Sequence, residues 1–313
     1  MKNTLNGIIL SCIGGRYTVL SNDLRYSCYA KGSFRHQGIK PHCGDYVSFV
    51  PGASFPNDGS SLPPSKENDG YLTEVLKRKN ILRRPPIANI DTLLIVAASA
   101  NPAPDTVYID RLTVCAKLAN ITPILIFNKF DLAPNIANEL TSLYRSAGFS
   151  AFPLSADNIN DSDVELLRAL LQGKTTALAG FSGVGKTTIF NLIFPHYKGE
   201  VGELSAKLSR GKNTTRSTEL HSLRQSVLNI DGLFADTAGF SRLELGRLDE
   251  ISANDLVYYF PEFEEFLCKC QFTKCTHQTE VGCAIRQAVD KGLVSESRYK
   301  SFQTLYEELK KQK

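Results

Sequence analysis

One glycine-rich segment constrains the fold of this chain more than any other. Residues 180–187 read Gly-Phe-Ser-Gly-Val-Gly-Lys-Thr and match the pattern G-x-x-x-x-G-K-[ST]. Residues 176–179 before it suit a strand, and residues 188–194 after it suit a helix. In that order, the turn lets backbone N–H groups curl around a phosphate while the helix N-terminus adds partial positive charge. The segment therefore predicts an α/β domain that binds a phosphorylated ligand.

The residue types within this segment indicate separate chemical roles. Lys186 is expected to reach the β and γ phosphates of a nucleotide, and the Thr187 hydroxyl is expected to bind Mg²⁺. The other expected contacts with the nucleotide are Gly180, Phe181, Ser182, Gly183, Val184, Gly185 and Thr188. The loop alone does not distinguish ATP from GTP.

A base-reading element follows another apolar run. Residues 128–131 read Asn-Lys-Phe-Asp directly after residues 123–127, which suit a buried parallel strand. The Asp131 carboxylate can accept hydrogen bonds from the N1–H and N2–H₂ edge of guanine, where adenine carries a lone pair. Lys129 can lay its aliphatic stem over the base, and Asn128 can tie this element to the phosphate loop. The element predicts selectivity for guanine, although many such tetrapeptides are surface turns.

Two further elements are placed to complete a nucleotide site. Ser155 and Ala156 follow the next predicted strand, and the Ala156 N–H is expected to face guanine O6. Asp236 begins the sequence Asp-Thr-Ala-Gly after a later strand and is expected to hold Mg²⁺ through water. The N–H of Gly239, the last residue of that sequence, is expected to sense the γ phosphate.

The segment between the phosphate loop and Asp236 is polar. Thr215, or its neighbour Thr214, is expected to supply a second hydroxyl to Mg²⁺, although an ordinary loop explains both threonines nearly as well. Phe240 follows Gly239 at the position where many GTPases carry a glutamine that orients the attacking water. Because phenylalanine cannot do this, we expect weak intrinsic hydrolysis and dependence on a partner.

The order of these elements differs from that of ordinary small GTPases, in which the phosphate loop comes first and the base reader near the end. Permutation is tolerated because domain termini lie at the surface, often close together. The strands and helices expected in this domain lie at residues 92–98, 105–119, 123–127, 136–147, 151–154, 176–179, 188–194, 219–223 and 227–235. We predict a circularly permuted, doubly wound P-loop α/β GTPase domain over residues 77–245.

The first part of the chain is rich in short β-strands. They are expected as a hairpin at residues 7–20, which turns at Gly14 and Gly15, and at residues 26–30, 45–50 and 72–76. Five short strands and a long loop suit an oligonucleotide-binding (OB) type β-barrel over residues 1–76, although another small barrel fits the pattern about as well. Five cations follow at Lys77, Arg78, Lys79, Arg83 and Arg84; such a run is usually a solvated face but can contact phosphates.

Residues 246–313 are expected to form a helical zinc-binding domain. Cys270, Cys275, His277 and Cys283 offer three thiolates and one imidazole, a closed set that suits one structural, tetrahedral Zn²⁺. Buried reduced cysteines are a much poorer explanation of four such residues in so short a segment, and Cys268 is a spare candidate. We expect the surrounding helices to be poorly held without the metal.

Composition adds little to these motifs. The chain has 313 residues, a net charge of +4, 42% hydrophobic and 22% charged residues, which is ordinary for a globular protein that buries a core. Its apolar runs fall well short of the roughly 18 residues of a membrane span. The cysteine cluster suits a metal site in a reducing compartment. We therefore expect a cytoplasmic monomer that makes no membrane contact.

Taken together, these motifs resemble the ribosome small-subunit-dependent GTPase A family of bacterial ribosome-assembly factors. The resemblance covers nearly the whole chain. Residues 44–47 (Gly-Asp-Tyr-Val) and 78–85 (Arg-x-Asn-x-Leu-x-Arg-Pro) resemble the N-terminal OB domain of that family and its exit. The permuted nucleotide motifs resemble its GTPase core, and the cysteine and histidine cluster falls on its zinc motif.

The resemblance implies binding of GTP and GDP, and of the immature small ribosomal subunit and its rRNA near the decoding region. It also implies late maturation of that subunit, hydrolysis stimulated by it and release afterwards. The family commonly has a histidine with a catalytic part where Asn213 stands, and proline where Ala238 and Val281 stand. Two alternatives stay open: an RNA-binding protein that holds GTP as a structural ligand, favoured by Phe240 and Asn213, and an ATPase, opposed by Asp131.

Overall fold

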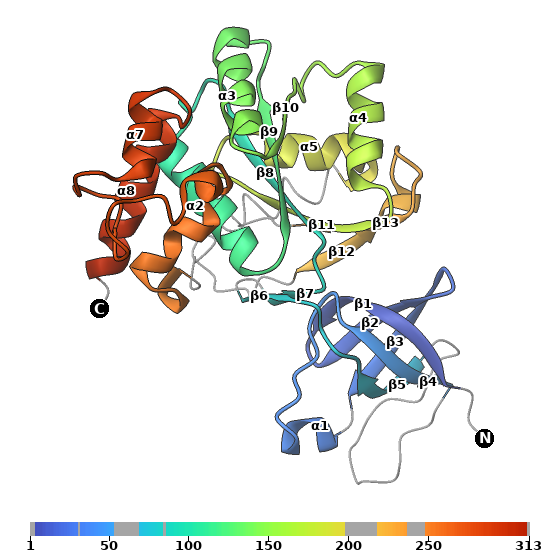
Figure 1. Ribbon diagram of the computed structural model, residues 1–313. Helices are drawn as coiled ribbons and strands as arrows, with labels where there is room; N and C mark the ends of the chain where they lie inside the picture. Colours follow the sequence, from blue (N-terminus) through green and yellow to red (C-terminus); the bar gives the residue numbers. More distant parts are fainter. Residues whose placement is uncertain are drawn as a thin grey trace, which may run out of the picture. The chain divides into compact units, whose positions relative to one another are not determined.

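The computed structural model describes residues 4–30, 32–52, 69–83, 86–197, 218–236 and 248–311. The chain forms two compact units, each assembled from separate stretches of sequence (Figure 1). The first unit consists of Met1–Asp91, Leu171–Ala177 and Phe194–Ala238. The second unit consists of Thr92–Leu170, Leu178–Ile193 and Gly239–Lys313. The division into domains at residues 76 and 245 stays a prediction.

The first unit begins with a closed five-stranded barrel. Its strands are β1 (Leu5–Ile13), β2 (Arg16–Ser21), β3 (Leu24–Ala30), β4 (Tyr46–Pro51) and β5 (Asp69–Val75). They pair in the order β1-β2-β3-β5-β4, and a further pairing of β4 with β1 closes the ring. A short helix, α1 (Gly32–His36), follows β3. The predicted five-stranded barrel is confirmed, and its interior is filled by Ile9, Val19, Cys28, Phe34, Val47, Phe49 and Leu72.

The basic run after the barrel serves in part as structure. Arg78 donates to both carboxylate oxygens of the fully buried Asp45, at 2.7 and 2.8 Å, and Lys79 pairs with Asp91. The hydrogen bond to Asp45 raises the pKa of Arg78. A hairpin that the sequence did not predict, β6 (Ile81–Arg83) and β7 (Pro86–Ala88), follows. Arg78 and Lys79 are therefore engaged in ion pairs rather than simply solvated.

Three more strands belong to the first unit in whole or in part. β12 (Glu219–Ser222) is antiparallel to β13 (Gly232–Asp236), and β13 is parallel to β11 (Lys174–Ala179). The strand predicted at residues 227–235 is wrong at its start. Leu228 and Ile230 are buried as a strand pattern suggests, but Leu228 lies in a turn and Ile230 in an irregular segment. Asn229 between them has a positive φ of 46° that a strand does not allow.

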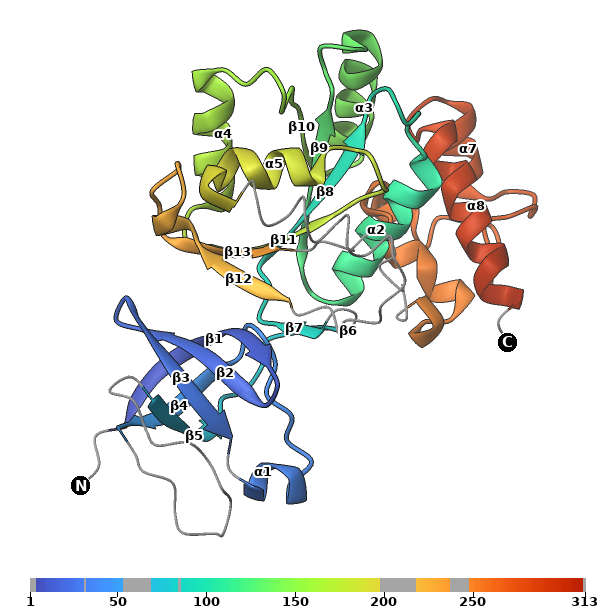
Figure 2. The same ribbon diagram turned by 180° about the vertical axis from the view of Figure 1, so that it is seen from behind.

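The second unit contains a parallel sheet with the strand order β10-β9-β8 (Figure 2). These strands are β8 (Thr92–Ala98), β9 (Thr122–Asn128) and β10 (Ser150–Pro153). α2 (Thr106–Leu118) connects β8 to β9, and α3 (Pro134–Ser146) connects β9 to β10. α4 (Asp161–Leu171) follows β10, and α5 (Lys186–Ile193) follows β11. Every residue of β8 is buried, as its continuous apolar run predicts. Asp105 caps α2, since its carboxylate accepts from Tyr108 N at 3.0 Å.

The C-terminal part of the second unit packs on α2. It contains α7 (Ala284–Asp290), α8 (Glu296–Lys311) and short 3₁₀ helices, of which η5 (Ala253–Tyr259) and η6 (Pro261–Phe266) are the longest. The rings of Phe260, Phe263 and Phe302 lie 5.1 to 5.5 Å apart in its core. None of the helices in the described part of the chain is both long and apolar enough to cross a membrane.

Candidate nucleotide site and metal centre

The phosphate-loop motif lies where the sequence predicts it, between the end of β11 at Ala179 and the start of α5 at Lys186. Gly180 has a φ of +146° and Gly185 a φ of +100°. A Cβ atom on Gly180 would lie 2.1 Å from Val96 O, and one on Gly185 would lie 2.1 Å from Asn128 Nδ2. Both glycines are therefore needed for the loop to lie this close to β8 and to the end of β9.

Lys186 folds back over this loop. Its Nζ donates to Gly180 O at 3.0 Å and to Phe181 O at 2.7 Å. Burial lowers the pKa of Lys186 to about 8, because the charged ammonium is partly removed from water. Thr187 and Thr188 follow in the first turn of α5. A phosphate at this position would therefore supply the negative partner that a desolvated ammonium lacks.

The Asn128 side chain joins three of the predicted elements. It is 1% exposed; its Nδ2 donates to Val184 O at 2.9 Å, and its Oδ1 accepts from Ala156 N at 3.0 Å. The structure thus brings the base reader, the phosphate loop and the segment at Ser155 together, although they lie up to 56 residues apart in sequence. The Ala156 N–H already has an acceptor, so a bond to guanine O6 would be shared between two acceptors.

Asp131 and Ser155 hold each other in place. Asp131 N donates to Ser155 Oγ at 2.9 Å, and Ser155 Oγ donates to Asp131 Oδ1 at 2.8 Å. Asp131 is exposed. Ser155 therefore fixes one carboxylate oxygen of Asp131 and leaves the residue facing solvent, as a residue that reads the edge of a base requires.

Lys129 is held at its backbone and at its ammonium. It has a positive φ of 62°, which is uncommon for a residue with a side chain. Its Nζ donates to Gly183 O at 2.9 Å and to Asn101 O. Ser99, which follows β8 and was not singled out in the sequence, has its hydroxyl 2.7 Å from Lys129 O. The sequence carried no signal for Ser99, because a lone serine after a strand is ordinary.

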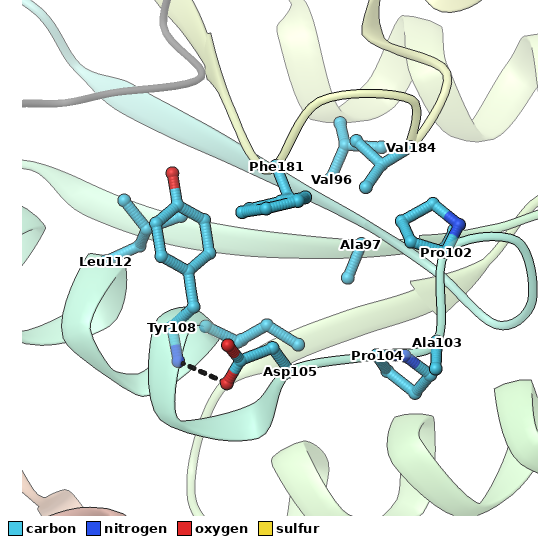
Figure 3. A pocket seen from close by; sticks show the side chains of 12 residues that line it. Val96, Ala97, Pro102, Ala103, Pro104, Asp105, Tyr108, Leu112, Phe181 and Val184 are labelled. Carbon is cyan, nitrogen blue, oxygen red and sulfur yellow. Dashed lines mark hydrogen bonds between the residues drawn. The ribbon is translucent and has the colours of Figure 1, made fainter.

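The phosphate loop also borders an apolar cavity of about 230 Å³ (Figure 3). The ring of Phe181 lies 5.7 Å from that of Tyr108 and edge-on to it. Residues that line the cavity are Val96, Ala97, Ala98, Pro102, Ala103, Pro104, Asp105, Tyr108, Ile109, Leu112, Phe181 and Val184. The side chain of Phe181 lines this cavity, so the expected contact of Phe181 with a nucleotide falls to its backbone.

The four predicted metal ligands converge in the loop before α7. The ligand atoms of Cys270, Cys275, His277 and Cys283 lie within 4.8 Å of one another. His277 Nδ1 lies 3.5 Å from Cys270 Sγ and 3.4 Å from Cys283 Sγ. Tetrahedral zinc with its usual bond lengths places sulfur and nitrogen ligands roughly 3.5 Å apart. Three thiolates and an imidazole in this arrangement fit a structural metal ion.

The backbone around these ligands is held by groups that are not ligands. Glu280 accepts from Thr276 N at 2.7 Å and from Gln278 N at 3.0 Å. Tyr299, on α8, donates to His277 O at 2.8 Å. The loop therefore presents its ligands through contacts with its own turn and with the helical core.

Comparison with known proteins identifies the family. A sequence model described as RsgA GTPase matches residues 75–246, and one described as RsgA N-terminal domain matches residues 6–54. The chain belongs to the RsgA family of GTPases. The family match confirms the resemblance found in the sequence and the prediction that this protein is a GTP hydrolase.

Relatives and solved structures of the RsgA family match nearly the whole chain. The small ribosomal subunit biogenesis GTPase RsgA of Caldanaerobacter subterraneus subsp. tengcongensis is 36% identical over 307 residues, which cover 98% of this chain and 96% of that protein. The protein of the same name from Geobacillus sp. is 36% identical over 313 residues, with 98% of each covered.

Two crystal structures have the same fold. The structure of YloQ, a circularly permuted GTPase, has a TM-score of 0.76 and 31% identity and covers 99% of this chain and 96% of its own. That of YjeQ from Thermotoga maritima has a TM-score of 0.77 and 29% identity, with 98% and 99% covered. The permuted order predicted from the sequence is therefore confirmed.

Some predicted residues of this RsgA-family chain lie outside the described part. Thr215 and Gly239 are among them, as are Asn213 and Phe240. Asp236 is described in its backbone, as the last residue of β13. The roles of these residues in Mg²⁺ binding and in sensing the γ phosphate stay predictions.

The lowered pKa of Lys186 predicts how nucleotide binding by this RsgA-family protein depends on pH. Below about pH 8, Lys186 is charged in the free protein. Above that pH the free protein loses this proton, and binding of an anionic phosphate must restore it. We therefore expect the affinity for GDP to fall between pH 7 and 9, by at most about tenfold per unit once the pKa is passed.

A titration of GDP affinity against pH tests this expectation. In Lys186→Arg the guanidinium stays charged over the whole range, so the fall should be much smaller. An equal slope in both proteins would show that another group titrates.

Removal of a metal ion from the Cys₃His cluster of this RsgA-family protein should loosen only the loop that carries the ligands. The helices around the cluster have an apolar core of their own, and α8 packs on α2. This structure therefore argues against the expectation that these helices are poorly held without metal. After chelation, we expect faster amide hydrogen exchange in residues 268–283 and retained protection in α8. Loss of protection throughout α8 would restore the earlier expectation.

Proposed function

We propose that this GTPase acts in late biogenesis of the small ribosomal subunit and hydrolyses GTP when it is bound to that subunit. The observation that carries the nucleotide part is the bridge made by Asn128 between the phosphate loop at Val184 and the segment at Ala156. The ribosomal part rests on the relatives, which are named small ribosomal subunit biogenesis GTPases and match over nearly their full length.

Guanine selectivity is proposed to come from Asp131. Ser155 holds one of its oxygens, so the carboxylate can present a fixed edge to the N1–H and N2–H₂ groups of guanine. Adenine would leave the carboxylate unpaired, and a site built in this way rejects such an analogue strongly. The stem of Lys129 is proposed to cover the base, since its ammonium is tied to Gly183 O and Asn101 O.

The triphosphate is proposed to lie in the loop at residues 180–187. Backbone N–H groups and the N-terminus of α5 face such a ligand, and Lys186 stabilises negative charge on the transferred phosphoryl group. Bound Mg²⁺ would add positive charge at the β and γ phosphates. Thr187, Thr215 and Asp236 are the residues proposed to hold it.

The N-terminal barrel and the C-terminal region with the Cys₃His cluster are proposed to bind ribosomal RNA. A five-stranded barrel of this topology suits an oligonucleotide, and contacts with phosphates would be weakened by salt. The Cys₃His cluster is proposed to hold one structural Zn²⁺, which leaves no open position for chemistry. We also propose that the protein works in the cytoplasm, where ribosomal subunits are assembled, and that it is a monomer.

Turnover of GTP and ATP, each with and without small subunits, tests the proposal. We expect small subunits to raise GTP turnover at least about tenfold, since partner-supplied groups raise such rates by roughly 10³ to 10⁵ in other GTPases. ATP turnover should stay low, and large subunits serve as the control. Unchanged GTP turnover would favour an RNA-binding protein that holds GTP as a structural ligand.

A further inference from the structure

A single hydroxyl after β8 anchors the turn that carries the base reader. Ser99 is 1% exposed, and its Oγ lies 2.7 Å from Lys129 O and 3.0 Å from Asn128 O. Ser99 N also donates to Asn128 O at 2.9 Å. Because the backbone N–H already serves Asn128 O, the hydroxyl hydrogen is available for Lys129 O.

The Ser99 hydroxyl contacts Lys129, a residue with an unusual backbone conformation. Lys129 has a φ of +62°, a conformation that a residue with a side chain keeps only when its surroundings hold it. Fixing Lys129 O fixes the plane of the peptide that leads into Phe130, whose N–H donates to Leu154 O at 3.1 Å. Asp131 is the next residue, so the direction of its carboxylate depends on this peptide plane.

The same short segment also holds the other end of Lys129. Asn101 O accepts from Lys129 Nζ, which ties the long side chain across the turn. Ser99 and Asn101 thus hold Lys129 at its carbonyl and at its ammonium. The segment just after β8 therefore helps to position two groups: the Lys129 stem proposed to cover the base, and the Asp131 carboxylate proposed to read its edge.

We propose that Ser99 is a positioning residue for guanine recognition, which it supports by holding the Lys129 peptide and hence the carboxylate of Asp131. The inference rests on the proposed role of Asp131. Ser99→Ala should still fold, because Asn128 O keeps the bond from Ser99 N and Lys129 O keeps one from Leu132 N at 3.0 Å.

The test compares the affinities for GDP and inosine diphosphate, which lacks the 2-amino group that Asp131 would bind. We expect Ser99→Ala to reduce the ratio of the two affinities by about three- to tenfold, the effect of one weakened hydrogen bond. Thr141→Val is the matched control, since the Thr141 hydroxyl is also buried and donates to Ala137 O at 2.7 Å within α3. It should leave the ratio unchanged even where it lowers the melting temperature.

An Asp131→Asn variant separates the two ways in which the idea can fail. If Asp131→Asn changes the ratio and Ser99→Ala does not, the positioning role of Ser99 is wrong. If neither variant changes it, the proposed base reader is wrong as well. A purely structural role for Ser99 predicts a lower melting temperature with an unchanged ratio, and that result would also overturn the inference.

Discussion

Replacing Lys186 with alanine should lower GTP turnover by about 10²- to 10³-fold, the usual loss when one charge-stabilising donor is removed from a reaction centre. Lys186 is the first residue of α5, and its Nζ already bridges two carbonyls of the phosphate loop. No other residue of the loop at 180–187 carries a positive charge. Turnover should be measured at saturating GTP, so that weaker binding does not mimic slower chemistry.

The control for this variant is Lys300→Ala. Lys300 is an exposed residue of α8 whose Nζ pairs with Glu296 at 2.7 Å, and its loss should leave turnover unchanged. The melting temperature of Lys186→Ala should change little, because Phe181 is exposed and water can donate to its carbonyl in place of Lys186, although Gly180 is buried. Turnover by Lys186→Ala close to that of the unaltered chain would refute the assignment of the phosphate site.

Replacing Arg298 with alanine should destabilise the second unit by about 3–5 kcal/mol, because it leaves buried carboxylates without a counter-charge. Arg298 Nε donates to Glu262 Oε1 at 2.6 Å, and Arg298 Nη1 donates to Asp110. The side chains of Arg298 and Asp110 are 1% and 0% exposed. Burial acts to lower the pKa of Arg298, but the two carboxylates outweigh it and raise the pKa.

A matched variant distinguishes this effect from the loss of any contact between α2 and α8. Arg111, also on α2, pairs with Glu308 of α8, but both side chains are partly exposed. Arg111→Ala should cost about 1 kcal/mol or less, since solvent screens such a pair. Urea unfolding followed by circular dichroism measures both variants. Equal losses in the free energy of unfolding would show that burial does not make the ion pairs of Arg298 more important for stability than the exposed pair of Arg111.

Arg298 also explains how the C-terminal region is attached. Its guanidinium lies 4.7 Å from the ring centre of Phe260 and 5.4 Å from that of Tyr144. Tyr144 Oη donates to Asp110 at 2.6 Å. One side chain of α8 thus contacts α2, α3 and the 3₁₀ helices. A buried polar centre therefore joins the C-terminal region, which carries the cysteine and histidine cluster, to two helices of the same unit.

Local sequence patterns were sufficient for much of the fold. The continuous apolar run at β8 and the Asp105 cap of α2 are short-range signals, and both elements lie where they were predicted. The start of β13 was mistaken because burial alternates in the same way in a turn and in a strand. At Leu228 and Ile230, the backbone forms a turn and an irregular segment in spite of the apolar pattern.

The functional site also has parts that the sequence predicts and parts that only the structure shows. The phosphate loop, the base reader and the four metal ligands were visible in the sequence because each is a short segment in which chemistry demands certain residue types at close spacing. The anchors of these segments were not visible. Ser99 serves Lys129 from 30 residues away, Asp45 holds Arg78 from 33 residues away, and Arg298 meets Asp110 across 188 residues.

The sequence by itself determined what kind of molecule this is: a permuted GTPase core with a small β-barrel and a cysteine-rich metal cluster. The tertiary structure decided which ordinary residues hold those parts in working positions. The physical reason is that a serine, an aspartate or an arginine gains its role from burial and from the partner brought beside it. Neither property is encoded in the residues next to it in the chain.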